Sequence, residues 1–319
     1  MKLVEVFSTP KNKSFFFGYH DTSQISHDDK YILSIKVDDI YSLPTSAIVY
    51  DIYLFDINTG FFDKVSSTKT VNFQQGSRLH WIDNNHFITN DFNGFSYFSK
   101  IIDIKTKNVV KKFNHPIYSL SNNKKFALNV DFERLYWKRR GYSYDAIQNK
   151  NKNYNLYPNE SINFFSLDGS IEKKLFTIND VLKINFNKMM LNSTHYLEHI
   201  SISPDDKKFI FLHRYKLDDG GIFTRLMKYN FSDEKLSLLV DSGRISHFTW
   251  ISNSELLFYG SFGNILTLAR KKTYFKKLFK ILLKFYKTFI KDNSKISKLS
   301  TGDGYKIINV DNMLKKNIN

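Results

Sequence analysis

The sequence predicts an all-β fold built from repeated four-stranded units. The repeat is clearest in residues 19–33 and 199–211, where an alternating strand, a tight Asp-rich turn and a second strand follow one another. A unit this small cannot bury its apolar face unless neighbouring copies pack against it. Thirty Phe and nineteen Tyr against five Pro and thirteen Gly favour strands, because aromatic side chains pack well on a half-buried pleated surface.

Two kinds of strand pair alternate along the chain. The inner pair carries the Asp-rich turn and is expected at residues 22–36, 78–90, 117–130, 199–213 and 247–259. Its partner is an outer hairpin with a turn at residues 56–60, 103–108, 166–170 or 231–235. Together they form a four-stranded blade, which predicts a β-propeller. A pair of β-sandwiches is the competing interpretation, but the recurring Ser-Pro-Asp-Asp-like turn favours the propeller.

The spacing of the inner turns sets the expected number of blades. Their anchor residues are Ser26, Ile82, Ser121, Ser203 and Ile251, separated by 56, 39, 82 and 48 residues. These intervals bracket the length of a propeller blade if the longest one holds an insertion, which we place between residues 132 and 192. Six or seven four-stranded blades are therefore expected. Residues 299–319 are too few for a whole blade, so the last blade is expected to be incomplete or missing.

Composition narrows the classes of function and compartment. The chain contains no Cys, which excludes disulfides, thiolate metal sites and a cysteine nucleophile. No stretch has the apolar core of a secretory signal or the length of a membrane span, so a cytoplasmic protein is expected. A net charge of +16 favours polyanionic partners such as nucleic acid, acidic lipid or uronate-bearing glycans. A compositional bias of an AT-rich genome would explain the charge equally well.

A basic segment follows the repeats. Apolar residues recur at helical spacing after residue 271, opposite a stripe of Lys, and residues 271–298 hold ten Lys and one acidic residue. Such an amphipathic helix suits the surface of an anionic membrane, or it packs its apolar side on the propeller. We therefore expect a propeller domain over residues 1–268, a basic amphipathic helix over 269–298 and a terminal strand or tail over 299–319.

Polar side chains recur where the inner strands begin, which is the mouth of the central channel of a propeller. Three interpretations compete for this set: a divalent metal site for Mn²⁺ or Zn²⁺, general acid–base chemistry beside a carboxylate held by Arg, or hydrogen bonds between blades. The residues at or just before the strand starts are His20, Gln75, His115, His199 and His247, and Arg78, His80, His213 and Arg214 follow nearby.

Residues 132–144 are rich in aromatic and basic side chains. Sugar rings stack on Tyr and Trp, and Arg binds carboxylates bidentately, so this run suits an acidic saccharide. It suits single-stranded nucleic acid by base stacking, and an insertion anchored by its own aromatics is the structural alternative. No dinucleotide, P-loop, serine-hydrolase or His-Glu-x-x-His motif occurs, so those chemistries lack their usual sequence support.

Several motifs together resemble a group of bacterial propeller proteins that accompany surface-polysaccharide genes and are similar to the oligogalacturonate lyase and ulvan lyase propellers. The resemblance covers about residues 15–260 and implies a seven-bladed type of scaffold with an acidic glycan as ligand. The usual final motif of the group is reduced here to Asp303-Gly304-Tyr305. The motifs that carry the resemblance are residues 17–21, 72–76, 139–144, 199–205, 211–214 and 246–250.

The resemblance also implies site residues. Oligogalacturonate lyases hold Mn²⁺ with three His and one Gln, and ulvan lyases use His, Tyr and Arg in β-elimination. The metal candidates are Gln75, His199 and His247, with no clear third His. The catalytic candidates are His199, His213, Tyr142, Tyr144, Arg134 and Arg214, and the candidates for substrate binding are Tyr19, His20, Arg78, Trp137 and Arg140.

These expectations lead to a carbohydrate-active, polysaccharide-lyase-like propeller that acts on or binds a uronate-containing bacterial polysaccharide or its lipid-linked precursor. The alternative is a non-catalytic propeller scaffold in surface-glycan biosynthesis, tethered to the inner membrane by residues 271–298. Nucleic-acid binding through the basic surface is a third and weaker expectation.

Overall fold

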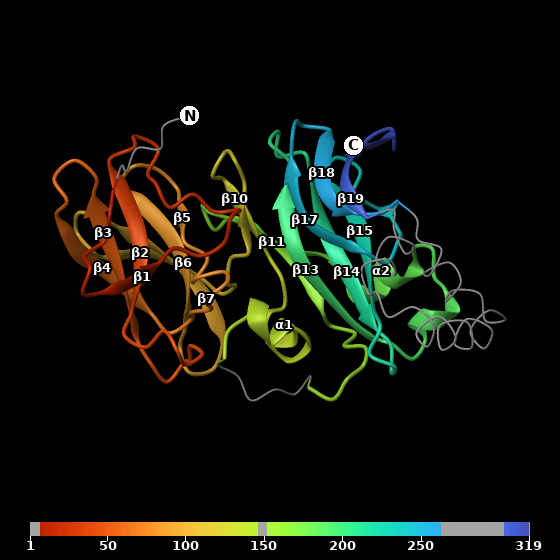
Figure 1. The fold of residues 1–319 in the computed structure, drawn as a ribbon, viewed down its shortest axis with the longest axis horizontal. Helices are drawn as coiled ribbons and strands as arrows, with labels where there is room; N and C mark the ends of the chain where they lie inside the picture. Colours follow the sequence, from red (N-terminus) through yellow and green to blue (C-terminus); the bar gives the residue numbers. More distant parts are fainter. Residues whose placement is uncertain (1–6, 146–151, 263–302, 319) are drawn as a thin grey trace, which may run out of the picture. The chain divides into compact units, whose positions relative to one another are not determined.

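The computed structural model describes residues 7–145, 152–262 and 303–318. Almost all regular structure in these residues belongs to five four-stranded antiparallel sheets, and in each sheet the strands neighbour one another in chain order (Figure 1). The chain is therefore an all-β propeller of four-stranded blades, as predicted. The described part holds five blades, against the six or seven expected from the spacing.

The chain divides into two compact units. Unit 1 comprises residues 1–153 and 162–174, and unit 2 comprises residues 154–161 and 175–319. Unit 1 contains the blades β1–β4 and β5–β8 and nearly all of β9–β12. The bounds are Ser14–Phe16, Tyr31–Val37, Tyr50–Asp56, Phe62–Thr68, His80–Trp81, His86–Phe92, Tyr97–Asp103, Val109–Phe113, Ser119–Leu120, Phe126–Asn129, Ser161–Ser166 and Glu172–Thr177.

Unit 2 contains the blades β13–β16 and β17–β20. Their bounds are Thr194–Ile202, Lys208–Lys216, Ile222–Asn230, Lys235–Val240, Ile245–Trp250, Glu255–Gly260, Gly304–Asn309 and Lys315–Asn317. The last two strands come from the C-terminal residues that were expected to form a separate strand or tail. Gly304–Asn309 pairs with β18 along its whole length, so these residues complete the fifth blade.

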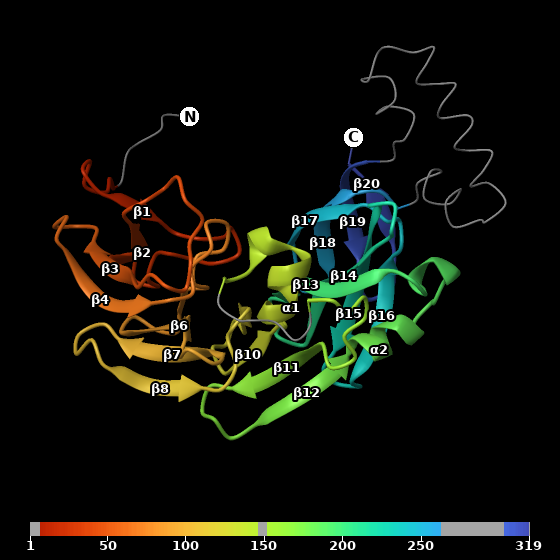
Figure 2. The ribbon, with the colours of Figure 1, turned by 90° about the horizontal axis from the view of Figure 1, so that it is seen from below.

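Short helices occupy the long insertion. They are α1 (Phe132–Lys138), the 3₁₀ turns η1 (Arg140–Tyr142) and η2 (Lys188–Met190), and α2 (Ile178–Lys183). Helix α1 begins where the Asp131 side chain accepts the Arg134 backbone N–H at 2.8 Å, which satisfies one of the free donors of the first turn. In unit 2, α2 lies against the blade β13–β16 (Figure 2).

The Asp-rich turns share one set of hydrogen bonds, which explains their recurrence. The hydroxyl of Ser26 donates to Asp28 at 2.7 Å and accepts the Tyr31 backbone N–H at 3.0 Å. Ser121 and Ser203 make the corresponding bonds to Asn123 and Asp205. The third residue after each Ser is left-handed, with φ between 56° and 60°. Ile82 and Ile251 introduce turns that are one residue shorter.

Each unit has its own apolar core. In unit 1 the buried side chains of β2, β3 and β6, among them Leu33, Ile52 and Phe87, form one cluster. In unit 2, Leu212, Leu226 and Phe258 belong to another. The basic segment 269–298 lies outside the described residues, so its helix stays a prediction. Within the part of the chain that the structure describes, no helix is long and apolar enough to cross a membrane.

Candidate functional site

Three blades have a basic residue in a left-handed conformation in their first strand or, for Arg78, two residues before it. Arg78, His199 and His247 have φ of 55°, 56° and 42°, and each lies four residues before its anchor. The pairing register shifts at His199 and at His247, so both occupy β-bulges, which redirect a side chain out of the regular pleat. Sequence inspection singled out these three residues but not their backbone conformation.

In unit 1 two of the resembling motifs meet backbone to backbone. Gly18 and Gly76 both have positive φ, 126° and 60°. A Cβ at Gly18 would lie 3.1 Å from the Gln75 carbonyl oxygen, and a Cβ at Gly76 would lie 3.0 Å from the Phe17 carbonyl oxygen. Both positions therefore require glycine, and the contact fixes residues 17–21 beside residues 72–76.

Arg78 is wholly buried beneath this contact. Its guanidinium forms two hydrogen bonds to the Asp21 carboxylate, at 2.9 and 3.0 Å, donates to the Tyr118 carbonyl and stacks over the Tyr118 ring at 4.4 Å. Burial acts to raise the pKa of Asp21, but the charge and hydrogen bonds of Arg78 outweigh it and hold that pKa below its usual range. The guanidinium of Arg78, which was predicted to bind substrate, thus forms hydrogen bonds to Asp21 and Tyr118 within the protein.

Gln75 and His80 lie in the same buried region. The Gln75 side-chain amide donates to the Tyr118 hydroxyl at 3.2 Å, and Gln75 is 1% exposed. Burial, reinforced by the charge of Arg78, lowers the pKa of His80 to about 3. His80 is therefore neutral at physiological pH.

Tyr144 anchors the turn that follows α1. Its hydroxyl accepts the Asn90 side-chain amide at 3.0 Å, its carbonyl accepts the Tyr97 hydroxyl at 2.7 Å, and its ring stacks on Phe132 at 4.9 Å. Asn90 is itself fixed by two hydrogen bonds to the Ile117 backbone. Burial raises the pKa of Tyr144, so this predicted catalytic residue is a buried, protonated structural phenol.

Four partly or fully exposed side chains lie close to one another and include residues of this turn. We call them the aromatic surface: Tyr19, His20, Arg139 and Tyr142. The rings of Tyr19 and His20 lie 4.2 Å apart, and those of Tyr19 and Tyr142 lie 6.4 Å apart, edge to face. The Arg139 guanidinium lies 4.2 Å from the centre of the Tyr142 ring. The structure thus brings together three predicted site residues, Tyr19, His20 and Tyr142, and adds Arg139.

The other predicted residues of the insertion are divided between interior and surface. Arg134 is wholly buried in α1. Trp137 is covered by the Lys152 ammonium at 4.7 Å, and the exposed Arg140 lies 5.3 Å from the Tyr136 ring. Arg140 is the more accessible of the two predicted arginines.

Unit 2 holds a second polar group, around a buried carboxylate. Glu198 is fully buried, and its Oε1 pairs with Nε of Arg214 and lies 3.5 Å from Nδ1 of His199. The side chains of His199 and Arg214 are 11% and 12% exposed. Glu198 was missed from sequence, although an acidic residue in an apolar strand directly before a histidine was an available signal.

His247 occupies the corresponding bulge of the next blade. Phe248 lies edge to face with the His199 ring at 6.4 Å, and the Trp250 indole donates to the Ser201 carbonyl at 3.4 Å. The first strands of these two blades are therefore neighbours. His199 and His247 belong to unit 2 and Gln75 to unit 1, and the described residues contain no group of three His, Cys, Asp or Glu placed to hold a metal. The metal site stays a prediction.

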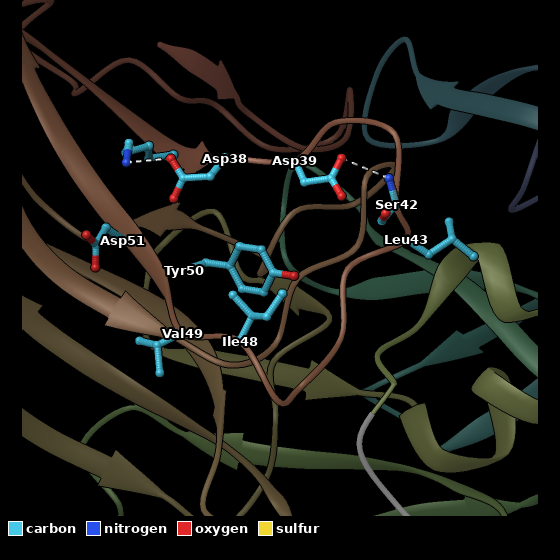
Figure 3. A pocket seen from close by; sticks show the side chains of 9 residues that line it. Asp38, Asp39, Ser42, Leu43, Ile48, Val49, Tyr50 and Asp51 are labelled. Carbon is cyan, nitrogen blue, oxygen red and sulfur yellow. Dashed lines mark hydrogen bonds and ion pairs between the residues drawn. The ribbon is translucent and has the colours of Figure 1, made fainter.

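A cavity of about 120 Å³ lies in unit 1 where β2 and β3 are joined (Figure 3). Asp38, Asp39 and Asp51 line it together with the ring of Tyr50 and one cation, Lys36. Its lining includes none of the predicted site residues. An excess of carboxylates repels an acidic saccharide, so the aromatic surface is the better candidate for that ligand.

No protein-family model matches the chain, and no curated protein matches it. Among solved structures it is similar to TolB from Acinetobacter baumannii, at 14% identity and a TM-score of 0.41, over 78% of this chain and 52% of TolB. It is similar to the β-propeller domain of the trilobed protease from Pyrococcus furiosus, at 13% identity and a TM-score of 0.43, over 74% of this chain and 61% of that one.

A third similar structure is oligogalacturonate lyase from Vibrio parahaemolyticus, at 10% identity and a TM-score of 0.41, over 97% of this chain and 79% of that enzyme. The chain thus spans only about half to three fifths of TolB and the trilobed-protease domain. These neighbours are β-propellers of differing activity.

Proposed function

We propose that this propeller binds a uronate-containing bacterial polysaccharide through the aromatic surface of unit 1. One observation carries the proposal: Tyr142 and Arg139 are held beside Tyr19 and His20 by a buried network. Tyrosine faces suit sugar rings, and a guanidinium binds a carboxylate with two hydrogen bonds. Such preorganised side chains lose little conformational freedom on binding. The net charge of +16 attracts a polyanion to the chain.

For a lyase-like activity, which we assign to unit 2 by itself and not to the aromatic surface of unit 1, the proposed general base is His199. Glu198 beside Nδ1 orients its ring, so Nε2 takes the proton from the carbon next to the uronate carboxylate. The electrons of that C–H bond form the ring double bond, and the glycosidic C–O bond breaks as its oxygen takes up a proton. We propose equally, as the alternative to a general base, that His199 and His247 bind Mn²⁺ or Zn²⁺. Metal analysis of protein purified without added ions distinguishes the metal site from the general base.

Calorimetric titration with oligogalacturonides and other uronate polymers tests the binding. Tyr142→Ala is expected to weaken binding by about fivefold, since stacking contributes on the order of 1 kcal/mol. Tyr305→Ala, at a 60% exposed tyrosine of unit 2, is the matched control. Equal affinity for Tyr142→Ala and the native chain would refute the site. The ultraviolet absorbance of an unsaturated uronate reports elimination separately, and the proposal expects it to vanish in His199→Ala.

A non-catalytic scaffold is the second candidate. The observation that favours it is the burial of His213, Tyr144 and Arg134, three of the six side chains predicted to be catalytic. In this proposal the propeller organises glycan-assembly enzymes at the cytoplasmic face of the inner membrane, and residues 271–298 are the tether. Deleting these residues is then expected to abolish liposome flotation, whereas His199→Ala leaves the cellular phenotype intact.

A further inference from the structure

Three buried basic side chains lie side by side across the blade β13–β16 in unit 2. They are His195 on β13, His213 on β14 and Arg225 on β15, with exposed fractions of 1%, 0% and 0%. His213 and Arg225 are direct cross-strand partners, and the rings of His195 and His213 are stacked at 5.3 Å. The proposed saccharide site does not use these residues.

The hydrogen bonds of this buried chain run in one direction. His195 Nε2 lies 2.8 Å from the Met190 carbonyl oxygen, and because a carbonyl only accepts, Nε2 carries the proton. His195 Nδ1 therefore accepts, and His213 Nε2, at 3.1 Å, donates to it. His213 Nδ1 then accepts from Arg225 Nη1 at 3.3 Å. Both imidazoles must be neutral, each with its proton on Nε2.

Both ends of this hydrogen-bonded chain of side chains bind residues 178–193, which connect β12 to β13. Arg225 donates to the Val181 carbonyl at 3.5 Å and to the Ile184 carbonyl, at the end of α2. His195 holds the Met190 carbonyl, at the end of η2. Beneath this segment, Met190 packs with Tyr215 and Phe223 in a small apolar cluster. Residues 178–193 are thus attached to the blade by two imidazoles and one guanidinium, in addition to buried apolar side chains such as Ile178 and Val181.

We propose that residues 178–193 are a latch that acid releases when His213 or His195 takes up a proton. A proton added to His213 must go on Nδ1, where it faces the N–H of Arg225. A proton added to His195 must also go on Nδ1, where it faces the N–H of His213. In either case two donors face each other, and at His213 the new charge also lies next to the Arg225 guanidinium, so the bonds that hold the latch fail.

The other charged groups around the chain do not relieve this conflict. Burial raises the pKa of Tyr215, on β14, to about 12, so it stays protonated. Asp241, after β16, acts on Arg225 and Tyr215. On α2, Asp180 pairs with Lys183 at 2.9 Å. Burial, then the charges of Arg225 and His195, hold the pKa of His213 well below its usual range in the closed latch, so the free energy of opening decreases as the pH falls below the ordinary pKa of histidine.

Hydrogen exchange of the full chain between about pH 7.5 and about pH 5 tests the latch. After correction for intrinsic rates, protection of residues 178–193 is expected to fall below about pH 6.5 by about tenfold per pH unit for each of the two imidazoles that takes up a proton on opening, while β14 and β15 keep theirs. His213→Gln keeps an acceptor for Arg225 and a donor for His195 without a titrating group at that position, so its latch protection is expected to fall less steeply than that of the native chain, and the double variant His195→Gln/His213→Gln is expected to stay flat. His86→Gln, at an outer ion pair with Asp83, is the control and should follow the native chain.

His195→Gln serves as the second variant, because its amide can donate to Met190 and its carbonyl can accept from His213. If His213→Gln does not fold, the pH dependence of latch protection in His195→Gln tests the proposal instead. Protection that is independent of pH in the native chain would overturn the proposal. So would an unchanged acid response in His195→Gln and His213→Gln, or a loss of protection shared equally by the latch and β14.

Discussion

The wholly buried Arg78 and the partly exposed Asp21 form an ion pair with two hydrogen bonds although 57 residues separate them in the sequence. The pair joins the loop after β1 to the residues directly before β5, the first strand of the next blade. Because Arg78 also donates to the Tyr118 carbonyl, one guanidinium links all three blades of unit 1. These contacts position Tyr19 and His20, which flank the pair in the aromatic surface.

Asp21→Asn is therefore expected to destabilise the fold. Removing one partner leaves the guanidinium of Arg78 buried without a counter-charge, which costs about 3 kcal/mol, the lower end of the usual range because the Asp21 side chain is 26% exposed. Urea unfolding measures the loss. Asp63→Asn, at a half-exposed pair with Lys107, is the control and is expected to change stability by less than about 1 kcal/mol.

The burial of His80 predicts a loss of stability in acid. Its pKa is about 3 in the folded chain and about 6.5 when unfolded, so below pH 6.5 the unfolded chain binds the proton first. Stability is complete above about pH 6.5 and falls as the pH drops toward 3, by about 2 kcal/mol at pH 5 from this residue alone. In urea unfolding across this range, the free energy of unfolding of His80→Asn should depend less steeply on pH than that of the native chain. An equal pH dependence in the two proteins would contradict the lowered pKa of His80.

The repeated blade could be predicted from sequence because its signals are local. The side chains of Ser26, Ser121 and Ser203 each form hydrogen bonds to residues no more than five positions away. The same turn therefore recurs wherever the same short sequence motif recurs. The pairing of Arg78 with Asp21 depends on contacts across blades, which no local pattern contains. A terminal strand or tail was expected at residues 299–319, but its pairing with β18 was not predicted, because more than 40 residues separate β18 from β19.

Tyr144→Phe is expected to weaken saccharide binding without contacting the saccharide. The change removes the hydroxyl that accepts the Asn90 amide at 3.0 Å and leaves a buried donor unsatisfied, at a cost of about 1–2 kcal/mol. Tyr142, two residues earlier, then loses part of its support. Calorimetry should show lower affinity than for the native chain, and urea unfolding should show the stability loss. Undiminished affinity in a destabilised Tyr144→Phe would separate the turn from the aromatic surface.

The left-handed backbone of His199 predicts a difference between two substitutions at that position. With φ of 56°, His199→Ala keeps the strain of a Cβ in this region, whereas His199→Gly removes it. Both variants lose the imidazole beside Glu198, so the loss of side-chain contacts cancels in the comparison. We expect His199→Gly to be more stable than His199→Ala by about 1 kcal/mol in urea unfolding, while both lack the proposed activity. If His199→Ala is the more stable variant, the bulge does not hold this conformation in solution, and the imidazole is not directed by the backbone.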